Sequence, residues 1–467
     1  MSPLDQVIVA AYLLATLAIG LMARERRRSR GDRRQGVSYL LAGRRLTLFG
    51  FVATMVSTWY GGILGVGEYT FKYGLSSWIV FGVPYYVAAA LFALFVAARA
   101  RKAASLTLPE QLHEAYGRGP GGFGAAVVLA TTLPAAYVLS FGVLLELAFG
   151  LPLHWGIVLG GVFSVVYLWR GGFEAVVRTD LLQFALMFTG FVMLLGVLIA
   201  DHGALPFLAA NVPPAHWSWS GGRTAQAVAV WYVIALATLV EPSFYQRCFA
   251  AESPQVARRG LLLSILFWLV FDLLTTATGL YARALLADLP PDQAIEAFPR
   301  LAALALPVGL VGLFHISMLA TVMSTVDSYL FIAASTVGRD LLARLPLQLD
   351  VTAATRVGLV TTGAATVGIA LASESVVSLW HAFGTVATCT LLVPVVGAFV
   401  PGLRMSPRAA LVSMASSFTL SLAWLLSGRI GDAYWLDLEP IYPGLGLAAL
   451  VWAADRAASR LAARRGC

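Results

Sequence analysis

Long apolar segments, separated by short polar ones, follow one another along almost the whole chain. Each is about 20 residues long, which is enough for an α-helix to cross the hydrocarbon core of a bilayer. Helices satisfy their own backbone hydrogen bonds in lipid, so this pattern predicts an all-α, polytopic membrane protein. We predict thirteen spans, at residues 6–23, 48–71, 76–98, 122–147, 154–169, 174–200, 224–246, 258–283, 303–337, 356–373, 376–400, 408–427 and 439–456.

Two of the predicted spans contain residues that break helices. The second holds STWYGGILGVGEY (57–69), and the seventh holds LATLVEPSFYQR (236–247), in which Glu241 stands directly before Pro242. A helix broken inside the membrane has to line a cavity, because its freed amides and carbonyls need partners there. We expect the glycines of the second span to unwind the helix and admit a bound molecule close to the backbone, with tight helix packing as the alternative. They are Gly61, Gly62, Gly65 and Gly67.

The spacing of the two breaks indicates an internal repeat. They lie five spans apart, and an odd step reverses direction, so the groups at about 48–200 and 224–400 have opposite orientations. Inverted repeats with broken helices are typical of secondary transporters and place a binding site near the bilayer midplane. No linker separates a soluble domain, so residues 1–467 are predicted to form a single integral membrane domain.

Charge matters here mainly through its distribution. Only 12% of the residues are charged, against roughly 25% in a soluble domain. The net charge of +8 could suggest a nucleic-acid partner, but we place all but five of the 32 basic residues on one side of the membrane and expect no such partner. By the positive-inside rule that side is cytoplasmic, which puts the N-terminus outside and the C-terminus inside the plasma membrane. The exceptions are Lys72, Arg223, Arg283, Arg300 and Arg429.

Five segments resemble, in the correct order, motifs of the sodium/solute symporter family, which takes up proline, sugars, pantothenate and choline. They are YLLAGRRL (39–46), LTLPEQLHEAYG (106–117), RGGFEAVVRTDLLQ (170–183), YQRCFAAESPQVARRG (245–260) and MLATVMSTVDSYLFIAASTVGRD (318–340). The resemblance implies a five-plus-five inverted-repeat (LeuT-like) core with two broken helices, covering the second to the eleventh span. The spans at 6–23, 408–427 and 439–456 would be accessory.

The same resemblance implies a function. We expect a sodium-coupled secondary active symporter that imports a small polar organic solute by alternating access, and not an enzyme. Its partners would be Na+, the solute and the lipid bilayer, with Na+ as the coupling ion and the only metal, no cofactor, and a functional monomer.

The resemblance also implies a sodium site. Ser324 and Thr325 lie in the middle of a span, with Thr321 one turn earlier on the same helix face. Their hydroxyls could join freed carbonyls of the broken second span around a cation, and Asp180 would be a nearby carboxylate that tunes the charge. The alternative is that the hydroxyls bond back to their own helix. The predicted ligands are Met55, Thr58, Thr321, Ser324 and Thr325.

Candidate solute-binding residues lie between the two breaks. STWYGG resembles the choline-uptake branch, in which aromatic side chains enclose a quaternary ammonium through cation–π attraction. Gly62 and Phe81 stand where sugar transporters use polar side chains, which disfavours a sugar. Glu241 could pair with a substrate amine, or it could cap the amides freed at the break. The predicted set is Trp59, Gly61, Gly62, Tyr85, Tyr137 and Glu241.

Two alternatives to sodium-coupled transport remain open from the sequence. One is a proton-coupled transporter of the same fold, and the other is a solute sensor that does not transport. Sensors of this fold usually append a cytoplasmic signalling domain, whereas this chain ends shortly after its last predicted span. A membrane enzyme would need a clustered nucleophile and base, or metal ligands facing one leaflet, and the sequence shows neither pattern.

Overall fold

The computed structural model describes residues 1–23, 32–342, 349–373, 376–430 and 433–465. Within these residues the chain consists of helices and turns, plus an isolated β-bridge between Leu46 and Ala251. The helices of the first half are α1 Pro3–Met22, α2 Asp32–Leu41, α3 Leu48–Trp59, α4 Ile63–Tyr73, α5 Ser76–Phe81, α6 Val83–Phe92, α7 Ala98–Lys102, α8 Leu108–Tyr116, α9 Arg118–Thr131, α10 Ala135–Phe149, α11 Leu153–His202 and α12 Leu205–Asn211. Those of the second half are α13 Ala225–Ile234, α14 Pro242–Ala250, α15 Pro254–Leu285, α16 Ala297–Ala305, α17 Leu310–Ser335, α18 Val351–Leu371, α19 Val376–Phe399, α20 Pro407–Ile430 and α21 Ile441–Arg465.

The long apolar helices confirm a polytopic membrane protein, with boundaries that differ from the predicted spans. By length and composition, ten helical segments of the described chain could cross a membrane, and the bent pair α3–α4 makes eleven. The predicted spans 154–169 and 174–200 both fall in α11, which Gly172 kinks with φ 56° and ψ −145°. The span predicted at 303–337 begins later, at Leu310, because a turn at 306–309 separates α16 from α17. The last predicted span lies in α21, which is not among the helices apolar enough to be counted.

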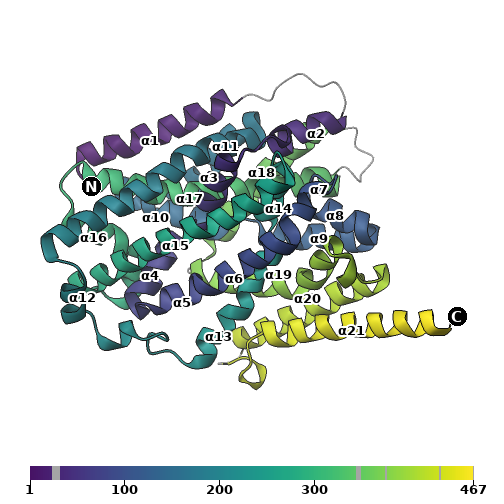
Figure 1. The fold of residues 1–467 in the computed structure, drawn as a ribbon. Helices are drawn as coiled ribbons and strands as arrows, with labels where there is room; N and C mark the ends of the chain where they lie inside the picture. The colour runs from purple at the N-terminus through teal and green to yellow at the C-terminus, as the bar shows by residue number, and fades with distance from the viewer. Residues whose placement is uncertain (24–31, 343–348, 374–375, 431–432, 466–467) are drawn as a thin grey trace.

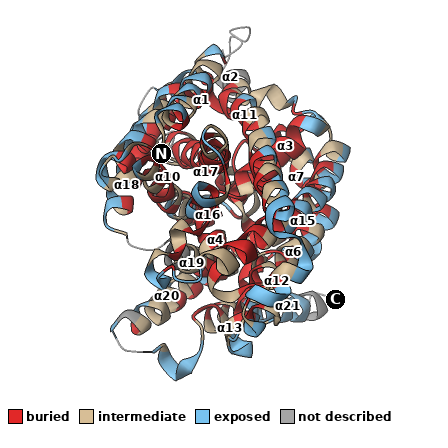
Figure 2. Cartoon of the chain, turned by 90° about the vertical axis from the view of Figure 1, so that its left-hand side faces the viewer, coloured by how far each residue is buried: buried red, intermediate tan, exposed pale blue. Residues whose placement is uncertain are grey.

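Helix α17 lies at the centre of the bundle, and the other helices surround it (Figures 1 and 2). It packs against α1, α3, α10, α11 and α18. In its most apolar stretch 83% of the residues are buried, against 28% in α1 at the periphery. Any polar side chain in the middle of α17 is therefore enclosed by protein, away from the lipid.

Helix α1 is tied to α17 at its first turn. One carboxylate oxygen of Asp5 accepts hydrogen bonds from the backbone amides of Gly309, at 2.8 Å, and Gly312, at 2.7 Å. These amides belong to the start of α17, where backbone donors have no partner within the helix. The two chain termini lie at opposite ends of the bundle, as Figure 1 shows.

Both predicted helix breaks are present. Helices α3 and α4 meet at an angle of 57° across residues 60–62. In the second break, α13 runs into a 3₁₀ turn, Ala235–Val240, and α14 begins at Pro242 with Glu241 as its N-cap. Proline suits the first position of a helix, because the missing amide would have no helical partner there.

The glycines of the second span have more than one role. Only Gly61 and Gly62 lie in the break, while Gly65 and Gly67 are inside α4. A Cβ on Gly67 would lie 2.8 Å from the ring of Phe298, so this glycine permits close packing of α4 against α16. The prediction that all four unwind the helix was therefore wrong for Gly65 and Gly67.

Candidate functional site

A cavity of about 190 Å³ lies where the two breaks face each other. The first break contributes Trp59 and Gly62 to its wall, and the second contributes Glu241 and Pro242. Broken helices in a membrane are expected to line such a space, because it is where their exposed backbone groups can be satisfied.

Nine aromatic residues line the cavity. Trp59 meets Tyr85 edge to face, with ring centroids 5.4 Å apart, and Tyr137 meets Tyr329 in the same way at 5.5 Å. Edge-to-face contacts hold such rings in place, so that their faces can receive a ligand. The aromatic residues of the wall are Trp59, Tyr60, Phe81, Tyr85, Tyr137, Trp231, Tyr329, Trp380 and Phe383.

Trp380 of α19 closes against the first break. A Cβ built on Gly62 would lie 1.5 Å from Cζ2 of this ring, so no larger residue fits at position 62 in this arrangement. The glycine thus allows a tryptophan from a distant helix to reach the cavity. Sequence reasoning missed Trp380, because a single tryptophan in an apolar span carries no local sign of its partner.

Two carboxylates, Glu241 and Asp272, also line the cavity, and its described wall contains no lysine, arginine or histidine. Glu241 accepts a hydrogen bond at 3.2 Å from the backbone amide of Ser243, as an N-cap does. Asp272 of α15 accepts one from the hydroxyl of Tyr86. The described lining therefore holds acidic groups without a basic one.

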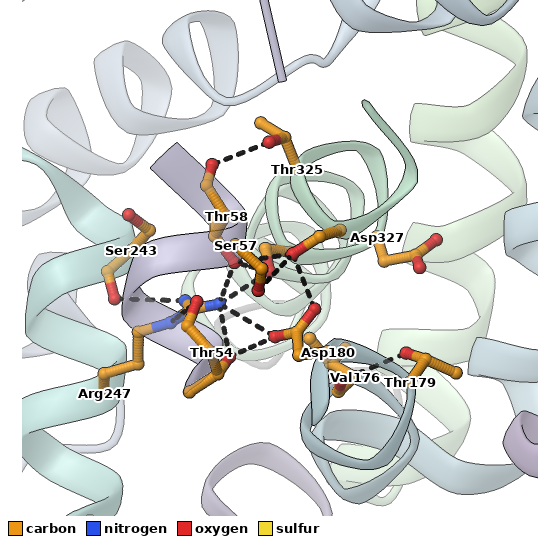
Figure 3. Close-up of polar contacts among 12 residues, drawn as sticks. Thr54, Ser57, Thr58, Val176, Thr179, Asp180, Ser243, Arg247, Thr325 and Asp327 are labelled. Carbon is orange, nitrogen blue, oxygen red and sulfur yellow. Dashed lines mark hydrogen bonds and ion pairs between the residues drawn. The ribbon is translucent and has the colours of Figure 1, made fainter. Parts of the chain in front are cut away.

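Beside the cavity, a cluster of oxygen atoms joins α17 to the end of α3 (Figure 3). The Thr325 hydroxyl donates to the carbonyl of Thr58 at 2.6 Å, which is one of the last carbonyls of α3 and lacks a helical partner. Ser324 Oγ lies 2.6 Å from Asp180 Oδ1 and 2.9 Å from the hydroxyl of Ser57. Three helices, α3, α11 and α17, thus meet through hydroxyl, carbonyl and carboxylate oxygens.

Arg247 of α14 completes this cluster, and its position was not predicted. The predicted spans place it directly after the seventh span, on the basic side of the membrane, whereas its side chain is 0% exposed inside the bundle. Its Nη2 lies 2.6 Å from the Thr58 hydroxyl, 2.7 Å from the Ser328 hydroxyl and 3.6 Å from Asp180 Oδ2. The helix continues past the break, which carries Arg247 into the bundle.

The structure brings most of the predicted sodium-site residues together. Thr58, Ser324, Thr325 and Asp180 are joined by the bonds above, and the Thr321 carbonyl lies 3.4 Å from the Thr325 hydroxyl. Met55 is buried one turn before Thr58 on α3. The residues that had not been predicted are Thr54, Ser57, Arg247 and Ser328.

Five of the six predicted solute-binding residues line the cavity: Trp59, Gly62, Tyr85, Tyr137 and Glu241. The sixth, Gly61, is not part of the described lining and faces the oxygen cluster instead. A Cβ at this position would lie 2.3 Å from Cβ of Thr325. The two adjacent glycines therefore serve two neighbouring sites.

Comparison with known proteins gives consistent results. The sequence model of the sodium:solute symporter family matches residues 39–416. The chain is 24% identical over 470 aligned residues to a high-affinity choline transporter of Drosophila melanogaster, covering 94% of this chain and 73% of the relative. It is 25% identical to the sodium/pantothenate symporter of Escherichia coli, covering 71% of each. A Na+-coupled sialic acid symporter, solved in a substrate-bound outward-open state, superposes with a TM-score of 0.78 at 18% identity over 98% of each chain, so the fold is shared.

Proposed function

Because the chain belongs to the sodium:solute symporter family, we propose that it is a sodium-coupled symporter that imports a small polar organic solute by alternating access. The observation that carries this proposal is the junction of α17 with the broken span, where Thr325 and Ser324 meet the Thr58 carbonyl and Asp180. Freed carbonyls at a broken helix are the groups with which transporters bind a coupling ion.

The donor set suits sodium. Hydroxyl oxygens of α17 and carbonyl oxygens of α3 are uncharged, and Asp180 adds a carboxylate whose charge Arg247 balances. We assign Met55, Thr58, Thr321, Ser324 and Thr325 as the ligands. An ion bound by both helices would favour the conformation in which they are joined, and this difference in affinity is what couples ion to solute.

The solute would occupy the aromatic cavity, which shares the first break with the oxygen cluster. Trp59, Gly62, Tyr85, Tyr137 and Glu241 are its proposed contacts. The adjacent Gly61 packs on Thr325. A movement of the break that is caused by binding in the cavity would therefore also move the oxygen cluster, and the reverse. The excess of basic residues on one side, with the termini at opposite ends of the bundle, supports an external N-terminus and a cytoplasmic C-terminus (Figure 1).

Thermal unfolding of the purified protein in detergent tests the ion site. Sodium chloride is compared with potassium chloride at equal ionic strength, for the wild type and for Ser324→Ala/Thr325→Ala. A ligand present at 100 times its Kd stabilises the folded state by about 2.7 kcal/mol, so sodium should raise the wild-type Tm and leave the double variant unchanged.

A matched control lies at the end of α17. Ser335 and Thr336 are the same residue pair, equally buried, but their hydroxyls bond back to the carbonyls of Phe331, at 2.6 Å, and Ile332, at 3.0 Å. Ser335→Ala/Thr336→Ala should keep the sodium response. If sodium stabilises neither the wild type nor this control while lower pH stabilises both, coupling to protons replaces the proposal.

A further inference from the structure

The carboxylates of Glu241 and Asp180 differ in their charge partners. Glu241 forms no ion pair with any described residue, although Arg247 stands on the same helix. Arg247 instead faces Asp180, where its guanidinium also bonds to Thr58 and Ser328. A carboxylate that lines an enclosed cavity without an ion pair is costly, so either a proton or a positively charged ligand is needed to balance it.

The environment of Glu241 favours a ligand as the partner. Its carboxylate stands at the break, accepts from the Ser243 amide at 3.2 Å and interacts with the hydroxyl of Tyr329. Tyr329 and Tyr137 are both part of the aromatic wall. Aromatic faces attract cations, and the attraction is strongest where water is excluded.

One hydroxyl in the same wall lacks a partner. The hydroxyl of Thr238 is buried without a hydrogen-bond partner among the described residues, whereas the side chain of Trp380 interacts with the Tyr137 hydroxyl. Buried polar groups are nearly always paired in native proteins, so the Thr238 hydroxyl points to an acceptor that a ligand supplies. A neutral oxygen fits best, since a ligand carboxylate would lie near Glu241 and Asp272 with no basic side chain in the described wall.

We propose that the cavity binds a small protonated amine that carries both an N–H group and a neutral oxygen acceptor, with Glu241 as its counterion. This inference rests on the proposed symport function and names the class of solute. The N–H group matters because a carboxylate can accept from it, whereas a quaternary ammonium would leave Glu241 with only the Ser243 amide and the Tyr329 hydroxyl as donors. The aromatic wall alone would favour the quaternary ion, so N-methylation separates the two recognition modes.

The test uses two series of probes that differ only in N-methylation. One runs from ethanolamine through its monomethyl and dimethyl forms to choline, and the other runs from tyramine to its trimethyl form. Affinities are measured from the thermal stabilisation of the wild type in sodium chloride. We expect at least one series to bind, with affinity falling at least about tenfold between the dimethyl and trimethyl members, where the last N–H is lost.

Glu241→Gln should bind every protonated member more weakly and remove the step at the trimethyl form. Its sodium response, measured alongside, shows that the variant is folded. Glu68→Gln is the matched control, because Glu68 lies on the same broken span but pairs with Lys72 at 2.6 Å and is absent from the cavity wall. It should retain the wild-type order of affinities.

The outcomes separate this inference from the function on which it rests. Tightest binding by the trimethyl forms, or unchanged affinities in Glu241→Gln, would overturn the inference and leave a quaternary ammonium site. Stabilisation by sodium without stabilisation by any amine would overturn it while the symport proposal stands. If sodium does not stabilise the wild type at all, that result would instead count against the symport proposal.

Discussion

The carboxylates of Asp180, which is buried, and Glu241, which is partly exposed, lie at neighbouring sites and have different charge partners. Asp180 accepts from Ser324 and Thr54 and lies 3.6 Å from the guanidinium of Arg247, and both charged side chains are 0% exposed. Glu241 interacts with a backbone amide and a tyrosine hydroxyl, and it forms no ion pair with a described residue, so Arg247 acts on it only from a distance. The protein thus supplies a positive charge in contact with Asp180, and by our inference a bound amine supplies the one that Glu241 lacks.

This difference separates a carboxylate with a permanent counterion from a carboxylate whose counterion can exchange. An ion pair enclosed by hydrogen bonds cannot be opened without exposing a bare charge, so Asp180 and Arg247 are expected to stay paired. A carboxylate that faces a cavity can exchange its counterion, and this is what a solute site needs. Arg247 belongs to the same short helix as the Glu241 N-cap, so α14 connects the two sites physically.

The largest expected effect comes from removing the buried cation. Arg247→Met leaves Asp180 enclosed without a charge partner, and breaking a buried pair in this way costs about 3–5 kcal/mol. Thermal and denaturant unfolding of the purified variant should show this loss. Adding Asp180→Asn to Arg247→Met should recover part of it, because the uncompensated charge is then removed as well.

The comparison requires Glu241→Gln to behave differently from Arg247→Met. Since Glu241 has no described ion pair, its neutralisation should change the free energy of unfolding by much less than the loss of Arg247. If Arg247→Met were as stable as Glu241→Gln, the distinction between a paired and an unpaired carboxylate would be wrong.

Substitutions of Gly61 and Gly62 test whether the oxygen cluster and the cavity are separate sites, and we expect them to affect stability less than Arg247→Met. Gly61→Ala would push a Cβ against Thr325, and Gly62→Ala would push one against Trp380. Overpacking of this kind typically costs about 1–3 kcal/mol. We expect Gly61→Ala to reduce the sodium response and Gly62→Ala to reduce solute binding while sodium still stabilises the protein.

Combining Gly62→Ala with Trp380→Ala tests whether the clash with the Trp380 ring causes the loss of stability. The smaller side chain gives the new Cβ room, so the double variant should recover stability relative to Gly62→Ala alone. The same Trp380→Ala change should not rescue Gly61→Ala, whose new contact is with Thr325. Equal responses of both glycine variants to sodium and solute would show that the break serves a single site.

The sequence predicted one of these regions better than the other. Ser324, Thr325 and the two breaks follow from local patterns and motif positions, because polar groups and helix breakers in apolar spans are rare. Arg247 was misplaced for the opposite reason, since a basic residue after a break resembles the start of a cytoplasmic loop. Its burial depends on α14 continuing into the bundle, and the contact of Trp380 with Gly62 depends on the packing of distant helices.

The smallest expected loss of stability comes from a partly exposed ion pair, which serves as the reference for the buried one. Arg339 pairs with Glu110 at 2.9 Å, but their side chains are 31% and 18% exposed. Partly solvated pairs of this kind contribute about 0.2–1 kcal/mol and weaken as salt is added. Arg339→Gln should therefore lower stability slightly, and the difference from the wild type should shrink as potassium chloride is raised. If Arg339→Gln lowered the free energy of unfolding as much as Arg247→Met does, burial could not explain the large contribution of the Asp180–Arg247 pair, because the Arg339–Glu110 pair is partly exposed to solvent. A small, salt-sensitive loss would leave burial as the property that distinguishes the cluster around Asp180 from an ordinary ion pair.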